Sequence, residues 1–255
     1  MLRTSKKAFK IALCSMHLPK NYIYMIHSSM LKFGLFEDGL DGFMEVLYDV
    51  LGTQSSIVMP AFTFKNRGDI WRSNESRSQM GALTEHFRRN VAEGRSCHPL
   101  HSVCYSGPIS SEISTLMSLS SFGDDSVFKF LVNNEALNLS FGTDFVGGAS
   151  YLHLAEEQEA IFYREYVNLD FKVYDSNNRL INHQFKYFAR SKDIDGVEYK
   201  NEWAGLENDL QHSGLLRINN DLNAPIRVSP MLNCINFFSS MLKNNPHYVL
   251  RDKNV

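Results

Sequence analysis

The chain has 255 residues, of which 44% are hydrophobic and 21% are charged, and its formal net charge is -2. This balance is typical of a globular protein, and with no basic or acidic block it argues against partners such as nucleic acid or an anionic membrane. No apolar run is long enough for a membrane span. Four scattered cysteines without a Cys-x-x-Cys pair favour a cytoplasmic protein with reduced thiols.

The first half of the chain alternates between predicted helices and buried strands. Residues 1–18 indicate a short amphipathic helix, and the continuous apolar run 22–26 predicts a strand that is buried on both faces. Apolar residues recur at helical spacing over 43–51, and a second buried strand follows over 56–60. Residues 137–142 predict a third strand. Strand, helix and strand in this order form a βαβ unit, which predicts an α/β fold with helices on both faces of the sheet.

The second half departs from this pattern. Residues 169–174 and 180–188 flank the turn sequence Asp-Ser-Asn-Asn, which predicts an antiparallel hairpin and therefore a mixed sheet. We expect residues 189–202 to form a charged loop, and a last helix to begin at Ser229-Pro230 with the proline in its first position. The apolar face of this helix suits either the core or a homodimer. No linker divides the chain, so we expect residues 1–255 to form a single domain.

The segment 150–163 carries the clearest candidate for chemistry. It predicts a helix with Ser150 as its N-cap, and His153 and Glu156 share one face because they lie three residues apart. A carboxylate beside an imidazole orients the ring and favours its charged form. This pair could act as a general base, although such pairs are also common on solvated helix surfaces. Glu157 is the second choice for the orienting acid.

Three further polar segments are expected near this pair, because ligands of open α/β sheets bind beyond the carboxyl ends of the strands. His27, Ser28 and Ser29 follow the first strand, Ser78 to Gly81 open a helix, and Arg95-Ser96 lie in a loop. Free backbone amides at Ser28-Ser29 and at Met80-Gly81 could bind a phosphate without any lysine.

The ordered blocks MIHSSM, IVMPAFTF, SRSQMGALTEHFRR, RSCHPLHSV, SFGDDSVF and SYLHLAEE resemble the aminoglycoside 3-N-acetyltransferase family. The resemblance is specific from about Tyr22 to Tyr163 and weaker towards the C-terminus. It implies a three-layer α/β sandwich made of one acetyltransferase domain, acetyl-CoA as the acyl donor, no metal, and an amine on a sugar ring as the acceptor.

The resemblance also implies roles for individual residues. His153 matches the family's catalytic base and Glu156 the acid that orients it. The positions that match coenzyme-binding residues are His27, Ser28, Ser29, Ser78, Met80, Gly81, Arg95, Ser96 and Ser150. Ser150 stands where threonine is usual. Ala149 stands where asparagine is frequent, so the resemblance does not carry over a side-chain contact at that position.

Two alternatives use a different chemistry. Cys97 beside His98 could form an acyl-enzyme through its thiolate. Alternatively, Cys97, His98 and His101 could hold a zinc ion, although Pro99 disturbs the spacing and no fourth ligand is evident. A buried, unreactive cysteine is the simpler interpretation.

The acceptor is predicted from charge. A pocket that selects polycationic aminoglycosides should be strongly acidic, whereas this chain is nearly neutral. We therefore expect a nucleotide-linked amino-deoxysugar for surface polysaccharide synthesis, whose diphosphate and base could meet Arg67, Trp71 and Arg72. The first alternative is an aminoglycoside acceptor, as in antibiotic resistance. The second is an inert relative that only binds coenzyme A.

Overall fold

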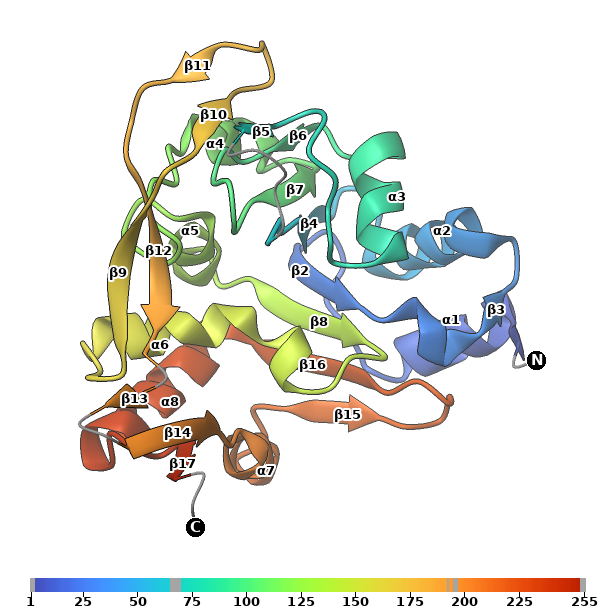
Figure 1. Cartoon of the computed structure of the whole chain (residues 1–255). Coiled ribbons are helices and arrows are strands. Elements are labelled where there is room, and N and C mark those ends of the chain that lie inside the picture. The colour runs from blue at the N-terminus through green and yellow to red at the C-terminus, as the bar shows by residue number, and fades with distance from the viewer. Residues whose placement is uncertain (1–2, 65–69, 192, 195–196, 253–255) are drawn as a thin grey trace.

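The computed structural model describes residues 3–64, 70–191, 193–194 and 197–252. Within these residues the central sheet has seven strands, shown in Figure 1. Their spatial order is β15 (Arg217–Asn219), β16 (Ile226–Pro230), β8 (Leu137–Phe141), β2 (Ile23–Ser28), β4 (Ser56–Pro60), β7 (Val103–Ser106) and β6 (Gly94–Arg95). β8, β2 and β4 run parallel, while the outer strands pair antiparallel, so the predicted mixed sheet is confirmed.

The continuous apolar run of β2 serves both faces of this sheet. Tyr24 and Ile26 point into one core, and Met25, which lies between them, points into the other. Successive strand residues face opposite sides, so a strand that is covered twice needs apolar residues at every position. This alternation produces the three layers that the resemblance implies.

Helices cover each face. On one side lie α1 (Lys6–Cys14), α2 (Gly39–Leu51) and α3 (Ala82–Asn90), which contribute Phe9, Phe43 and Leu83 to the core. On the other side lie α5 (Val127–Asn133), α6 (His153–Gln158), α7 (Ala204–His212) and α8 (Met231–Asn244). The apolar face of α8 is buried in this second core through Met231, Ile235 and Phe238.

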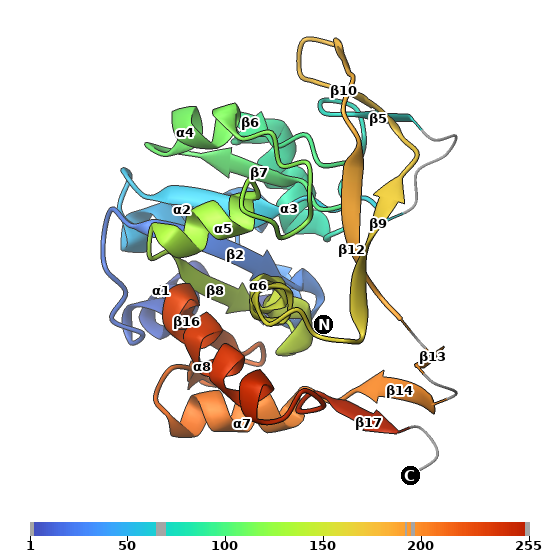
Figure 2. The same cartoon turned by 90° about the vertical axis from the view of Figure 1, so that its left-hand side faces the viewer.

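A two-stranded ribbon stands outside the central sheet. It consists of β9 (Arg164–Leu169) and β12 (Phe185–Arg190), paired antiparallel, and it crosses the edge at which β2 and β8 end (Figure 2). Along the chain between β9 and β12, the strands β10 (Lys172–Tyr174) and β11 (Leu180–Ile181) form the predicted hairpin. The strand β5 (Ile70–Arg72) pairs with β10 in parallel. The ribbon therefore flanks the edge of the sheet at which β2 and β8 end.

The remaining short elements connect these layers. They are β1 (Arg3–Thr4), β3 (Leu35–Phe36), α4 (Ser110–Thr115), β13 (Asp193–Ile194), β14 (Val197–Asn201), β17 (Leu250–Asp252) and the 3-10 turns η1 (Met30–Phe33), η2 (Val146–Gly148) and η3 (Ser150–Leu152). No helix in the described ranges is long and apolar enough to span a membrane.

Three local predictions are wrong. The charged segment 189–202 is not simply a loop, because β13 and β14 pair with each other and β14 also pairs with β17. Pro230 is the N-cap of α8 rather than its first residue, since it also ends β16. Ser150 does not cap a helix: the chain turns through η3 first, and α6 begins only at His153 without a side-chain cap.

Candidate functional site

The carboxyl ends of β2 and β8 bring two of the predicted segments together. Ser28 pairs with Phe141 across the sheet, and the Ser29 amide donates to the Phe141 carbonyl at 2.7 Å. The loop after β8 then places the Ser150 hydroxyl 3.0 Å from His27 Nε2. The hydroxyl that was expected to cap a helix therefore joins the two loops instead.

The start of α3 lies against the same edge. A Cβ atom added to Gly81 would be 3.7 Å from the Ser28 carbonyl oxygen, so the two loops are neighbours. Gly81 adopts φ 101° and ψ -179°, a conformation that is essentially restricted to glycine. The Ser78 hydroxyl accepts from the Met80 amide at 3.2 Å. A cavity of about 500 Å³ opens beside these residues, and it is lined by Arg77, Ser78, Gln79, Gly81, Ala82 and Glu85.

His153 and Glu156 form the predicted pair. His153 Nδ1 lies 2.5 Å from Glu156 Oε2, and a carboxylate only accepts, so Nδ1 carries the hydrogen. Glu156 is completely buried and is also held by the Tyr163 hydroxyl at 2.8 Å and by Arg164 Nε at 2.7 Å. The His153 side chain remains 24% exposed. Its Nε2 is therefore the ring nitrogen that remains for a substrate.

The electrostatics of this cluster keep the imidazole neutral. Burial lowers the pKa of His153, and the Arg164 guanidinium lowers it further, against the opposing effect of Glu156. Burial alone would raise the pKa of Glu156, but His153, Arg164 and Tyr163 together hold it below its usual value. The expectation that the carboxylate favours the imidazolium is thus outweighed. A neutral ring beside an ionised carboxylate is the resting form that a general base requires.

His153 opens into a cavity of about 300 Å³ beneath the β9–β12 ribbon. The cavity residues are mainly aromatic or basic: Phe62, Phe64, His101, Phe122, Ser150, His153, Arg164, Tyr187, Phe188, Arg190 and Asn201. The His153 ring meets Phe122 and Trp203 edge-on, with centroid distances of 5.3 and 5.6 Å. These contacts hold the ring at the cavity wall.

Glu157, the second choice for the orienting acid, has other neighbours. It is half-buried, and burial together with Asp124 raises its pKa. The hydrogen bond to His153 comes from Glu156. The geometry therefore favours Glu156 as the partner of the imidazole.

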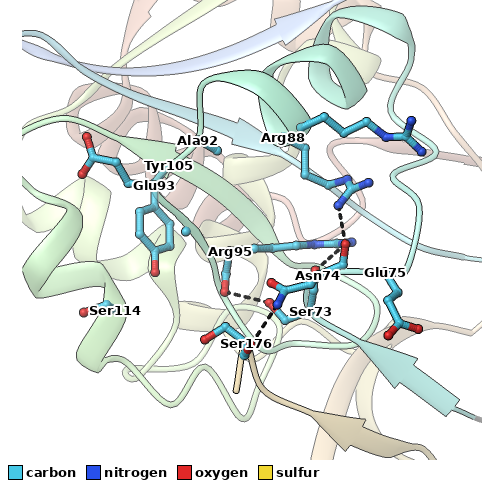
Figure 3. Close-up of a pocket in the computed structure, with 12 residues that line it drawn as sticks. Ser73, Asn74, Glu75, Arg88, Ala92, Glu93, Arg95, Tyr105, Ser114 and Ser176 are labelled. Carbon is cyan, nitrogen blue, oxygen red and sulfur yellow. Dashed lines mark hydrogen bonds between the residues drawn. The ribbon is translucent and has the colours of Figure 1, made fainter. Parts of the chain in front are cut away.

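Arg95 and Ser96 are buried, at or next to the outermost strand β6, rather than at the carboxyl ends of β2 and β8. All five N–H groups of Arg95 donate within the chain, to Ser102, Thr63 and the carbonyls of Ala61, Ser73 and Ser76. The Ser96 hydroxyl accepts from the Val103 amide at 3.0 Å. Arg95 does border a separate polar cleft of about 750 Å³ (Figure 3), which shares no lining residue with the His153 cavity. A direct contact of Arg95 or Ser96 with a coenzyme stays a prediction. It gains no support from Arg95, because every N–H group of that side chain already has an acceptor within the chain.

The environment of Cys97 does not suit a nucleophile. Burial raises the pKa of its thiol to about 11, and the residue packs against the cluster of Trp71, Val173 and Phe185. His98 cannot activate it, because its Nδ1 accepts from the Leu100 and His101 amides while its Nε2 donates to the Lys186 carbonyl. The simpler interpretation of Cys97, a packing residue, fits these contacts.

Substitution of Cys97 by serine is therefore expected to leave acyl transfer within about twofold of the native rate. The measurement is the initial rate of thiol release from an acyl-coenzyme A. A hundredfold loss in a folded variant, together with trapping of an acylated thiol by mass spectrometry, would restore Cys97 as the nucleophile.

The zinc alternative has no geometric basis within the described residues. They contain no group of three or more His, Cys, Asp or Glu side chains that could hold a metal ion. His98 already uses both ring nitrogens, as described above. His101 instead stacks beside it in the aromatic wall of the His153 cavity.

Two of the three residues expected to meet a diphosphate and a base are placed elsewhere. Trp71 is completely buried beneath the Arg95 guanidinium. Arg72 bonds to Asn178 and lies 4.0 Å from the Tyr174 ring centroid. Arg67 lies outside the described residues. Trp71 therefore cannot stack on a ligand, and this part of the prediction is wrong.

Four residues at the site escaped the sequence analysis: Arg77, Tyr163, Arg164 and Arg190. Tyr163 and Arg164 follow Glu156 by seven and eight residues, and their role depends on the turn after α6 that brings them back to the carboxylate. Arg190 reaches the cavity only through its pairing with Arg164 across the ribbon. Periodicity in the sequence carries no signal for such cross-strand pairs.

Comparisons with known proteins agree with this geometry. Among curated proteins none matches the sequence significantly. Three similar solved structures are AAC-IIIb bound to CoASH (18% identity, 94% of this chain and 97% of the other, TM-score 0.78), the aminoglycoside acetyltransferase AAC(3)-Xa (15%, 97% and 94%, 0.82) and the YokD protein from Bacillus subtilis (20%, 95% and 100%, 0.77). These likenesses establish the fold.

The family model for aminoglycoside 3-N-acetyltransferases matches residues 25–243, which include every element around His153. The expected donor is supported as well, since a structure of the same fold holds CoASH. The chain is therefore an N-acetyltransferase that belongs to the aminoglycoside 3-N-acetyltransferase family.

Proposed function

We propose that the protein transfers the acetyl group of acetyl-CoA directly to an amine on an amino sugar, with His153 as the general base. The observation that supports this most is the buried Glu156 carboxylate, which fixes His153 Nδ1 and leaves Nε2 at the cavity. We treat residues 1–255 as one acetyltransferase domain in the cytoplasm, where the cysteines, all free in the structure, would stay reduced.

The chemistry follows from the protonation states. His153 Nε2 takes a proton from the sugar ammonium, directly or through a water, and so produces the neutral amine that can attack. The nitrogen bonds to the thioester carbonyl carbon and the carbon–sulfur bond then breaks. His153 returns its proton to the leaving thiolate, and the acylated nitrogen releases its remaining extra proton to solvent, which gives the neutral amide. Glu156 and Tyr163 hold the imidazole network during both transfers. Backbone amides at the sheet edge are the simplest donors for the oxyanion.

The coenzyme supplies an activated acyl group as a thioester, and the residues at the start of α3 fit it. No side chain caps the N-terminus of α3, which lies beside the cavity that Arg77 and Ser78 line. The Met80 and Ser29 amides, which were expected to be free, already donate to Ser78 and Phe141. Ser28 and Ser29 lie next to the start of α3. We propose that these two loops receive the phosphates, with Ser150 and His27 between them and His153.

Replacement of Gly81 by alanine should weaken coenzyme A binding by about tenfold or more, because a Cβ at this φ and ψ costs about 1–3 kcal/mol and shifts the loop. Isothermal titration with coenzyme A measures the effect. The matched control is Gly205→Ala, because Gly205 lies in the first turn of α7 and an added Cβ would meet nothing within 4 Å. Equal affinities for both variants would remove the Gly81 loop from the coenzyme site. A native chain that binds no coenzyme A would refute acetyl transfer as a whole.

The comparisons favour an aminoglycoside as the acceptor. The matched family carries that name, and solved structures of AAC(3)-IVa with the same fold contain apramycin and a gentamicin. They support this alternative better than the nucleotide-linked amino-deoxysugar expected first from the sequence. An inert, coenzyme-binding relative is the weakest candidate, because the polar partners of His153 are all in place.

The lining of the His153 cavity supports a nucleotide-linked amino sugar as the second candidate acceptor. No aspartate or glutamate is among the described residues that line the His153 cavity, although a polycationic acceptor calls for carboxylates. The test is a thiol-release screen that offers aminoglycosides and nucleotide-linked amino sugars at equal concentrations. Rapid turnover of gentamicin with none of the nucleotide-linked amines would establish an aminoglycoside as the acceptor.

A further inference from the structure

Two arginines face each other where the β9–β12 ribbon meets the His153 cavity. Arg164 begins β9, Arg190 ends β12, and the two are direct partners in the antiparallel register. Both line the cavity that contains His153. The ribbon that carries both arginines stands across the sheet edge (Figure 2).

The two arginines differ in how their charge is balanced. Arg164 forms an ion pair with Glu156 at 2.7 Å, so its charge is neutralised locally. Arg190 donates from Nη2 to the Tyr199 carbonyl at 2.7 Å, and its buried Nε has no partner among the described residues. No described carboxylate lies within ion-pair distance of it. With His153 neutral, the cavity therefore carries a surplus positive charge at Arg190.

We propose that Arg190, supported by Arg164, is an anion subsite that selects an amino sugar bearing a phosphate group. This inference rests on the proposed acetyl transfer and chooses between its two acceptor classes. Planar guanidinium groups bind phosphate oxygens in bidentate fashion. A phosphate here would neutralise Arg190, whereas an acceptor with several ammonium groups would add like charge to a cavity without described carboxylates in its lining.

The walls of the cavity fit a nucleoside diphosphate as the source of that phosphate. Phe64 is 51% exposed, an unusual position for a large aromatic ring, and Tyr187 is partly exposed on the ribbon. Aromatic faces of this kind stack on nucleobases without regard to their identity.

The test compares one pair of amines that differ only in phosphate and adds two amines that represent the two acceptor classes. The probes are glucosamine, glucosamine 6-phosphate, a nucleoside-diphosphate-linked 4-amino-4,6-dideoxyhexose and gentamicin, and kcat/KM is measured for each by thiol release. We expect the phosphorylated amines to exceed glucosamine and gentamicin by at least tenfold. A greater rate with the nucleotide-linked sugar than with the monophosphate would identify the diphosphate as the natural source.

Arg190→Gln should reduce the preference for phosphorylated amines about tenfold, mainly through KM, and Arg190→Lys should restore part of it. Arg179→Gln is the control, because it removes the same charge from the exposed end of the β10–β11 hairpin. Binding of glucosamine 6-phosphate to the coenzyme-saturated protein, followed by the fluorescence of Trp203 beside His153, gives a readout that needs no turnover.

The outcomes separate the two proposals. Turnover that prefers gentamicin or glucosamine, or a preference that Arg190→Gln leaves unchanged, overturns the anion subsite while acetyl transfer stands. Absence of both turnover and glucosamine 6-phosphate binding overturns the subsite as well. Failure of the proposed function itself appears separately, as a native chain that does not bind coenzyme A.

Discussion

Replacement of His153 by asparagine is expected to reduce the acetylation rate about 100- to 10,000-fold, with the protein still folded. Asparagine keeps a donor towards Glu156 but cannot take a proton from the acceptor amine, and general base catalysis contributes about this much. The measurement is single-turnover acetylation with a saturating donor, because it reports the chemical step rather than product release.

The pH profile tests the same role in the native chain. Burial and Arg164 lower the pKa of His153, so the ring stays neutral at pH 7 and the rate should fall only as pH decreases through this lowered value. The control for His153→Asn is His212→Asn, which should keep the native rate and pH profile because His212 lies exposed on α7. If His153→Asn retains more than a tenth of the native single-turnover rate, His153 is not the base.

Replacement of Glu156 by glutamine should lower the free energy of unfolding by about 3 kcal/mol at pH 7. The substitution leaves Arg164, whose side chain is only 7% exposed, without its counter-charge, and a buried ion pair that loses one partner typically costs about 3–5 kcal/mol. Urea unfolding measures the loss. Because the folded pKa of Glu156 is depressed, its stabilising effect is fully present above the unfolded pKa and fades as pH falls through the folded value.

The same variant has a kinetic signature that a purely structural role would not produce. The Glu156 carboxylate raises the pKa of His153 against burial and Arg164, so Glu156→Gln should move the acidic limb of the rate profile to lower pH. Glu157→Gln is the adjacent control. It should leave the acidic limb of the rate profile in place and change the free energy of unfolding by no more than about 0.5 kcal/mol. An unchanged limb in Glu156→Gln would mean that this carboxylate does not act on the imidazole.

The central strands were predictable because both of their faces are buried. β2 and β4 read as continuous apolar runs, and their residues divide between the two cores. β8, Leu-Asn-Leu-Ser-Phe, alternates instead, with Leu139 and Phe141 in one core and the buried polar residues Asn138 and Ser140 between them. β16 was missed because its sequence, Ile-Arg-Val-Ser-Pro, ends in a proline that also suggests a helix start. β13 and β14 were missed because they are short and half-exposed, so no hydrophobic period marks them.

The contacts of the candidate site likewise divide into those that local sequence predicts and those that depend on the fold. His153 and Glu156 are three residues apart on one helix, so local geometry predicts their contact. The bond between His27 and Ser150 joins segments that are 123 residues apart, and the arginine pair depends on the register of the ribbon. Arg95 looked like a coenzyme contact in the sequence, and only the fold shows that its five donors are already occupied.

The β9–β12 ribbon gives the enzyme a modular construction. The loops proposed for the donor belong to the central sheet and α3, whereas Arg190 and Tyr187 belong to the ribbon, which pairs with no strand of that sheet among the described residues (Figure 2). Acceptor preference can therefore diverge in evolution without rebuilding the half that recognises acetyl-CoA. An exchange of residues 165–190 between relatives, with Arg164 kept as the partner of Glu156, offers a direct route to redesigned specificity.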